Sequence, residues 1–75
     1  MKGVHMPKYS IVLQYDEADD IYVAIVPELK GCMAHGKTQA DAVREINIAM
    51  ELMVESMLED GEELPRPLTQ NSKIA

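Results

Sequence analysis

The sequence predicts a single α+β domain, in which a three- to four-stranded antiparallel sheet is covered on one face by one long helix. Three observations predict this class. Two segments near the N-terminus alternate apolar and polar residues with the period of two that is typical of strands. Residues 39–59 instead repeat apolar residues at the spacing of an amphipathic helix. The length of 75 residues allows one domain, so these elements must share one core.

The N-terminal half is predicted to form three strands. Residues 8–15 alternate with a period of two and are rich in β-branched and aromatic side chains. Residues 16–20 are polar turn formers, so residues 21–26 follow as the second strand of an antiparallel hairpin. Pro27 ends that strand, because proline cannot donate a hydrogen bond to a sheet. After a loop, residues 32–35 are long enough for a third strand, and Gly31 and Gly36 are expected to serve tight turns.

The helix is predicted over residues 39–59. Thr38 suits the N-cap, Asp41 lies at the capping-box position three residues later, and Gly61 suits the C-cap. The residues expected to face the sheet are Ala42, Ile46, Ala49, Met50, Met53 and Met57. Two prolines keep residues 64–67 extended, which allows a short edge strand there. Residues 1–6 and 70–75 are expected to be disordered.

One face of the sheet should carry the helix, and the other should be open. The odd-numbered strand residues are the more apolar set and are expected to face the helix: Ile11, Leu13, Ile21, Val23 and Ile25. The even-numbered set, which includes Val12, Tyr22, Ala24 and Val26, would then form the open face. This set is apolar enough to be a second contact surface, and Tyr22 is the residue on it that we predict to contact a partner.

Composition and charge limit the classes of function and partner that fit this chain. The net charge is −6 and the basic residues are scattered, which argues against direct binding of nucleic acid and favours a basic protein partner. One cysteine excludes an internal disulfide, and two histidines are too few for a structural zinc site. Self-association as a dimer or tetramer is therefore expected to support the small core. The sequence contains no membrane span and no signal peptide, so we expect a cytoplasmic location.

Two groups of residues that could carry chemistry are better explained by turns and packing. The acidic cluster of residues 16–20 could bind a divalent cation, but it has the composition of a solvated hairpin turn. Cys32 and His35 are three apart in a predicted strand, so their side chains point to opposite faces and cannot form a nucleophile–base pair. The first predicted strand contains no acid for two-metal chemistry. We therefore predict no catalytic residue, no metal ligand and no cofactor.

The polar side of the helix predicts a binding surface. Asp41, Glu45, Glu51, Glu55 and Glu59 lie on this side, and two apolar residues, Ile48 and Leu52, project among them. An apolar pair ringed by carboxylates is typical of a contact patch with a charged rim, which could serve self-association or a different protein. The same pair could instead be merely exposed or lie under the C-terminal segment. The predicted partner-binding residues are Glu45, Ile48, Glu51, Leu52 and Glu55, together with Tyr22.

Four segments of the chain resemble the N-terminal domain of the HicB family of antitoxins. They are residues 9–13 with the acidic turn after them, residues 22–32, residues 36–42, and Gly61 with residues 64–67. Residues 22–32 are the most specific of these, and the resemblance covers residues 7–67. It implies a partly degraded ribonuclease-H-like fold. Many members carry a C-terminal domain that binds DNA, but none follows here, so we expect no DNA-linked autoregulation.

The resemblance also implies a function. A HicB-type antitoxin neutralises a small basic mRNA-interferase toxin of the HicA type by occluding its active surface, and we expect the same of this domain, without chemistry of its own. The alternative is a stand-alone homo-oligomeric domain with a regulatory or structural role and no toxin partner. A residual metal-dependent nuclease is a third, weaker possibility.

Overall fold

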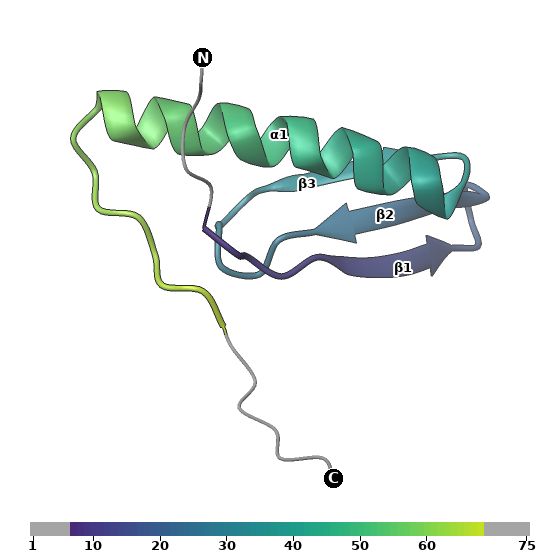
Figure 1. The fold of residues 1–75 in the computed structure, drawn as a ribbon. Coiled ribbons are helices and arrows are strands. Elements are labelled where there is room, and N and C mark those ends of the chain that lie inside the picture. The colour runs from purple at the N-terminus through teal and green to yellow at the C-terminus, as the bar shows by residue number, and fades with distance from the viewer. Residues whose placement is uncertain (1–6, 69–75) are drawn as a thin grey trace, which may run out of the picture.

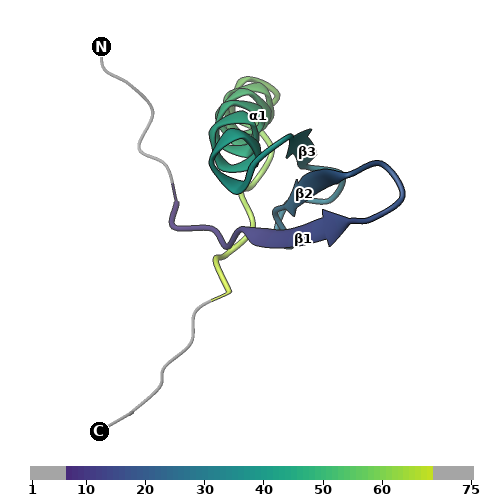
Figure 2. The same cartoon turned by 90° about the vertical axis from the view of Figure 1, so that its right-hand side faces the viewer.

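The computed structural model describes residues 7–68, which form a three-stranded antiparallel sheet and one helix (Figure 1). The strands are β1 (Val12–Asp16), β2 (Ile21–Ile25) and β3 (Met33–Gly36), in the sheet order β1-β2-β3. Helix α1 (Gln39–Glu59) covers one face of the sheet and lies nearest to β3 (Figure 2). The predicted α+β class is therefore confirmed. The expectations for residues 1–6 and 70–75 lie outside the described residues.

Helix α1 begins and ends where the sequence predicts. The Thr38 hydroxyl oxygen accepts a hydrogen bond from the backbone N–H of Asp41 at 3.0 Å, as an N-cap does. At the other end, Gly61 has a positive φ of 74°. The backbone N–H groups of Gly61 and Glu62 donate to carbonyls of the last turn at 3.1 and 2.9 Å, the two bonds of a Schellman cap. No helix within residues 7–68 is long and apolar enough to cross a membrane.

The prediction of which sheet residues face α1 is correct for β1 and wrong for β2. Leu13 of β1 pairs with Ala24 of β2, so odd-numbered residues of β1 share a face with even-numbered residues of β2. The turn between the two strands has four residues, and this even number reverses the parity across the hairpin. Tyr22 and Ala24 therefore face the helix, whereas Ile21, Val23 and Ile25 face outward.

Small residues on β2 and β3 explain why the helix packs against the less bulky face of the sheet. Ala34 pairs with Ala24, and Gly36 pairs with Tyr22, on the side of the sheet that α1 covers. An ideal Cβ placed on Gly36 would lie 2.6 Å from the backbone nitrogen of Ala42 in the first turn of α1. Gly36 is thus the last residue of β3 and provides space for the helix. The expectation that it serves a tight turn is wrong.

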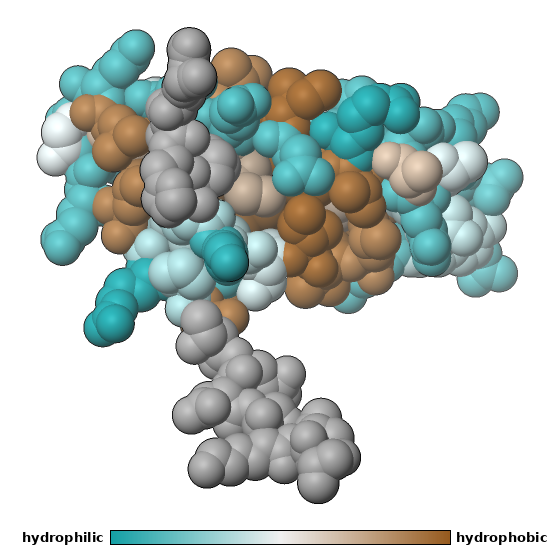
Figure 3. Space-filling view, viewed as in Figure 1, coloured by the Kyte–Doolittle hydropathy of each residue, from teal (hydrophilic) through white to brown (hydrophobic). Residues whose placement is uncertain are grey.

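The core lies between the helix and this face of the sheet. Its buried residues are Ala24, Val26, Leu29, Cys32, Ala42, Ile46, Met50 and Val54. Val54 was not among the helix residues predicted to face the sheet, although it lies four residues after Met50 and continues the same inward series. Ile11 and Leu13 stay partly exposed, and hydrophobic surface is visible between α1 and β1 (Figure 3). The helix therefore covers β3 well and leaves the β1 side of the core partly open.

Residues 64–68 do not form the predicted edge strand, because their two prolines lack the N–H groups that a strand pair needs. Side chains hold this segment instead. The Tyr9 hydroxyl donates to the carbonyl of Pro65 at 2.6 Å. The Glu28 carboxylate accepts hydrogen bonds from the backbone N–H of Leu68 at 2.8 Å and from the backbone N–H and hydroxyl of Ser10 at 3.1 and 3.0 Å. Glu28 thus joins the chain before β1, the loop before β3 and the C-terminal segment.

We expect Glu28→Gln to lower the stability of the domain in a pH-dependent way. Burial raises the pKa of Glu28, but the hydrogen bonds from Leu68 and Ser10 outweigh it, so the pKa lies below its ordinary 4.5. The carboxylate therefore contributes stability that is present above the unfolded-state pKa and is lost as pH falls through the folded-state pKa. The cost near neutral pH should be about 1 kcal/mol, because the group is half exposed.

Thermal unfolding followed by circular dichroism at several pH values checks this. The difference between the wild type and Glu28→Gln should be largest near neutral pH and vanish in acid. Glu63→Gln removes the same charge from an exposed side chain and serves as the control. An equal loss of stability in both variants, or a loss that persists in acid, would contradict the assignment.

Candidate partner-binding surface

The residues predicted to bind a partner lie on the outward side of α1. The inward side of the helix is formed by Ala42, Ile46, Met50 and Val54, all buried against the sheet. The outward residues are exposed, and we call them the helix stripe: Glu45, Ile48, Glu51, Leu52 and Glu55. The two apolar members have exposed fractions of 49% for Ile48 and 62% for Leu52. The described part of the C-terminal segment therefore does not cover them, and the helix stripe is open to a partner.

The charges around the helix stripe work against the stability of the helix. Asp41 and Glu45 are four residues apart, and so are Glu51, Glu55 and Glu59 in a second series. Each like-charge pair at this spacing costs about 0.2–0.5 kcal/mol. Glu55 and Glu59 also lie toward the C-terminus of α1, where the helix dipole disfavours negative charge, and the last turn has no basic residue. Helix stability therefore does not account for this pattern of charges.

These carboxylates have little to neutralise them. Arg44 is the one basic residue of α1, and its guanidinium forms an ion pair with Asp41 at 2.9 Å. Within residues 7–68 this is the only ion pair. Glu45, Glu51 and Glu55 thus have no ion-pair partner among the described residues, and all three are exposed. The helix stripe is a negative surface with two apolar side chains at its centre.

Tyr22 does not belong to this surface. It was predicted on the open face of the sheet, but the register places it on the face that α1 covers, where it packs against the core. Its ring lies 5.4 Å from the ring of Tyr15, whose side chain is 53% exposed and whose hydroxyl donates to Asp20 at 2.8 Å. A role of Tyr22 in partner binding stays a prediction, and its half-buried position does not favour it.

The outward face of the sheet is a second exposed surface, and its β2 members were assigned to the wrong side. We call it the open sheet face. It consists of Val12, Gln14 and Asp16 of β1, Ile21, Val23 and Ile25 of β2, and Met33 and His35 of β3. Val12 and Met33 have exposed fractions of 40% and 58%. The sequence places the turn at residues 16–20, and an odd number of turn residues keeps odd and even positions on the same face. The observed turn of four residues exchanges them, so the exact end of β1 decides which residues lie on this face.

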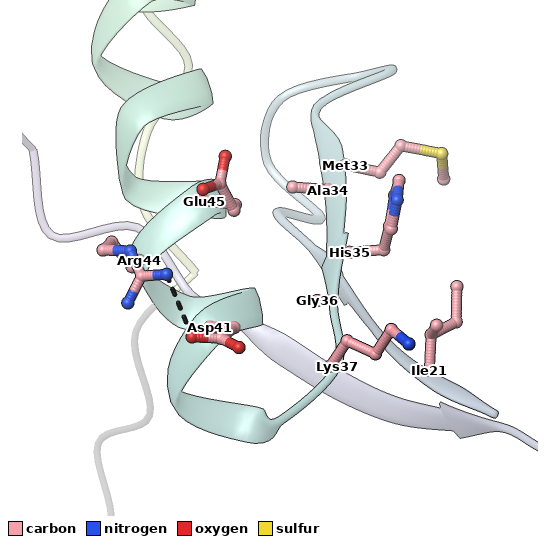
Figure 4. Close-up of a pocket in the computed structure, with 9 residues that line it drawn as sticks. All are labelled: Ile21, Met33, Ala34, His35, Gly36, Lys37, Asp41, Arg44 and Glu45. Carbon is pink, nitrogen blue, oxygen red and sulfur yellow. Dashed lines mark hydrogen bonds and ion pairs between the residues drawn. The ribbon is translucent and has the colours of Figure 1, made fainter.

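A shallow hollow connects the two surfaces at the edge of β3 (Figure 4). The first turns of α1 form one wall with Asp41, Arg44 and Glu45, and β3 forms the other. The side chains of Met33 and His35 point away from the helix in this view, toward the open sheet face. The polar groups that line the hollow carry both signs of charge and include no nucleophile beside a base.

The acidic residues before β2 form the predicted hairpin turn. The Asp16 carboxylate accepts a hydrogen bond from the backbone N–H of Ala18 at 3.1 Å, which is an Asx-type turn contact. Asp20 has a positive φ of 55°. One expectation needs correction, since β1 extends to Asp16 and is not free of acids. No group of three potential metal ligands occurs within residues 7–68.

Cys32 and His35 are separated as predicted. Cys32 is buried in the core, and this burial raises the pKa of its thiol. His35 is exposed on the open sheet face. A buried thiol with a raised pKa is a poor nucleophile, so the pair forms no catalytic site.

Known proteins resemble this chain over most of its length. A UPF0150 protein of Thermoplasma acidophilum is 39% identical over 59 residues, which cover 79% of this chain and 84% of that protein. A UPF0150 protein of Synechocystis is 36% identical over 77% of this chain and 72% of its own length. An uncharacterized 14.9 kDa protein of Haemophilus phage HP1 is 39% identical over 68% of this chain, which is 38% of that longer protein. No solved structure matches the chain significantly.

The family comparison agrees with these relatives and with the resemblance inferred from the sequence. The family model described as the HicB-like antitoxin of bacterial toxin-antitoxin systems matches residues 9–75, which include the hairpin, the loop before β3 and all of α1. The chain therefore belongs to the family of HicB-like antitoxins.

Proposed function

We propose that this domain neutralises a small basic mRNA-interferase toxin of the HicA type by covering the toxin's active surface with the helix stripe. The observation that carries the proposal is the acidic side of α1, whose glutamates form no ion pair within residues 7–68 and which has Ile48 and Leu52 exposed at its centre. Family membership supports a role in a toxin-antitoxin system. The identity of the toxin and the surface that binds it are our inference.

Charge supports the choice of surface. A toxin that cleaves RNA must hold phosphates, so its working surface has to be positive. A helix that presents Glu45, Glu51 and Glu55 without ion-pair partners within residues 7–68 has the opposite potential, which speeds encounter and orients the two proteins. Binding at that surface would exclude RNA directly. A toxin that acts on mRNA works in the cytoplasm, so the proposal places this domain there.

The domain needs no chemistry for this function. Asp16 and Asp20 accept hydrogen bonds from the Ala18 N–H and the Tyr15 hydroxyl, and the cysteine is buried. We therefore infer that it is a binding protein and not an enzyme. The alternative of a stand-alone homo-oligomeric domain without a toxin draws support from the apolar open sheet face. A small basic protein encoded beside this chain's gene would favour the antitoxin, and its absence would favour the alternative.

We expect Leu52→Ala to weaken toxin binding by about 1–2 kcal/mol, which is roughly 5- to 30-fold in Kd. Leu52 is an apolar side chain at the centre of the proposed contact, so its truncation should mainly speed dissociation. The domain should stay folded, because a side chain 62% exposed contributes little to the core. Surface plasmon resonance with the HicA-type toxin measures the effect, and circular dichroism checks the fold.

Leu58→Ala is the matched control. Leu58 is a second exposed leucine of α1, with an exposed fraction of 47%, but it lies outside the helix stripe. Its truncation should leave the affinity unchanged. Normal binding by Leu52→Ala, or an equal loss in both variants, would show that the toxin contacts another surface.

A further inference from the structure

We propose that two copies of this chain associate through their open sheet faces, packed sheet against sheet. Antiparallel sheets with one solvated face normally place polar residues on that face. Here the central strand β2 turns three β-branched apolar residues outward, Ile21, Val23 and Ile25. Ile25 is also the middle of an apolar row across all three strands, since it pairs with Val12 on one side and Met33 on the other.

Charge identifies the occupant as a second copy. The chain has a net charge of −6, so two copies repel each other most where their carboxylates gather, which is the helix stripe. The open sheet face carries one carboxylate, Asp16, and its Ile21 lines the same hollow as the basic Lys37 (Figure 4). This face is nearly neutral and predominantly apolar. It is poorly matched to a basic toxin and well matched to itself.

Symmetry adds a second argument. In a twofold dimer the same patch meets its own copy, so a patch must be complementary to itself. An apolar centre flanked by the uncharged Gln14 and by His35 meets this condition, since no burial of like charges is required at its centre. Two sheets packed in this way lie about 10 Å apart, a spacing that side chains of this size fill.

The arrangement leaves the proposed toxin surface free. The helix stripe faces outward from α1, and the open sheet face lies on the other side of the sheet that α1 covers (Figure 1). A dimer built through the sheets would therefore present two helix stripes on its outer sides and could bind two toxins. The association itself does not depend on a toxin.

Sedimentation equilibrium of the purified chain tests the proposal. The wild type should be a dimer at micromolar concentration. Val12→Glu and Met33→Glu should each raise the dimer dissociation constant about ten-fold or more, because each places a carboxylate inside the interface without a partner. Both side chains are exposed in the single copy, so circular dichroism should show unchanged folding. Leu58→Glu adds the same charge on α1 and should leave the dimer intact.

Four outcomes overturn the proposal of a sheet-to-sheet dimer, and a fifth bears on the proposed function alone. A monomeric wild type excludes the association. Sensitivity to Met33→Glu but not to Val12→Glu indicates pairing of β3 edges, because only β3 would then be near the second copy. Equal sensitivity to Leu58→Glu indicates an interface on the helix or a general charge effect. Loss of toxin binding in Met33→Glu with an unchanged dimer would assign the face to the toxin. A normal dimer that binds no basic toxin would overturn the proposed function alone.

Discussion

Gly36→Ala should destabilise this domain more than any other replacement of one described glycine by alanine. The added Cβ would lie 2.6 Å from the backbone nitrogen of Ala42 and 2.8 Å from the backbone carbonyl carbon of Asp41. Backbone atoms cannot rotate away as the end of a flexible side chain can, so the first turn of α1 would have to leave β3. We expect a loss of about 3 kcal/mol, at the upper end of the usual cost of overpacking. In a domain of this size, the melting temperature should fall by roughly 12–24 °C.

Gly31→Ala separates this effect from backbone strain. Gly31 has a positive φ of 83°, and nothing lies within 4 Å of the position of its Cβ. The substitution there costs only the left-handed conformation, about 1 kcal/mol. Gly36 is the opposite case, because a side chain there would collide with the backbone of α1. Thermal unfolding of the two variants should therefore differ by about 2 kcal/mol. Equal melting temperatures would mean that α1 moves to accommodate the methyl group at little cost.

The contrast between α1 and the sheet shows which features of this fold could be predicted from the sequence. The signals that define α1 are local: the cap at Thr38, the apolar period and Gly61 all lie within the helix or next to it. The face that each strand presents to α1 depends instead on pairing between strands. A shift of the hairpin register by one residue would turn Val23 toward the helix in place of Ala24. The choice also depends on how closely the helix approaches Gly36, which no single segment of the sequence encodes.

The same contrast between local signals and strand pairing applies to the two candidate surfaces. The helix stripe could be predicted residue by residue, since the position of Ile46 and Met50 on the inward side determines that Ile48 and Leu52 point outward. Tyr22 was misplaced because its side depends on the register of the hairpin. Leu29 was missed for a related reason. It lies in a loop, yet a turn closed by the hydrogen bond from Val26 N–H to the Cys32 carbonyl at 3.0 Å directs it into the core.

Replacing Glu51 and Glu55 together by lysine should slow the association of the domain with its toxin by about ten- to a hundred-fold at low salt. Both carboxylates are exposed on the outward side of α1 and form no ion pair in the part of the chain that the structure describes, so their reversal changes the potential that the toxin meets first. Dissociation should change less, because the apolar centre at Ile48 and Leu52 is untouched. The difference from the wild type should shrink as salt rises and screens these charges.

The fold should tolerate this change, which makes the result interpretable. Lysine at position 55 stands four residues before Glu59 and replaces a repulsive pair by an attractive one, and it also suits the C-terminal half of the helix dipole. The melting temperature should therefore stay the same or rise. Glu62→Lys with Glu63→Lys alters the net charge by the same amount on exposed residues beyond α1. If that control slows association equally, the toxin responds to the charge of the whole domain and not to the helix stripe. If neither variant slows it, electrostatic steering by α1 is excluded, and the affinity must come from apolar contacts alone.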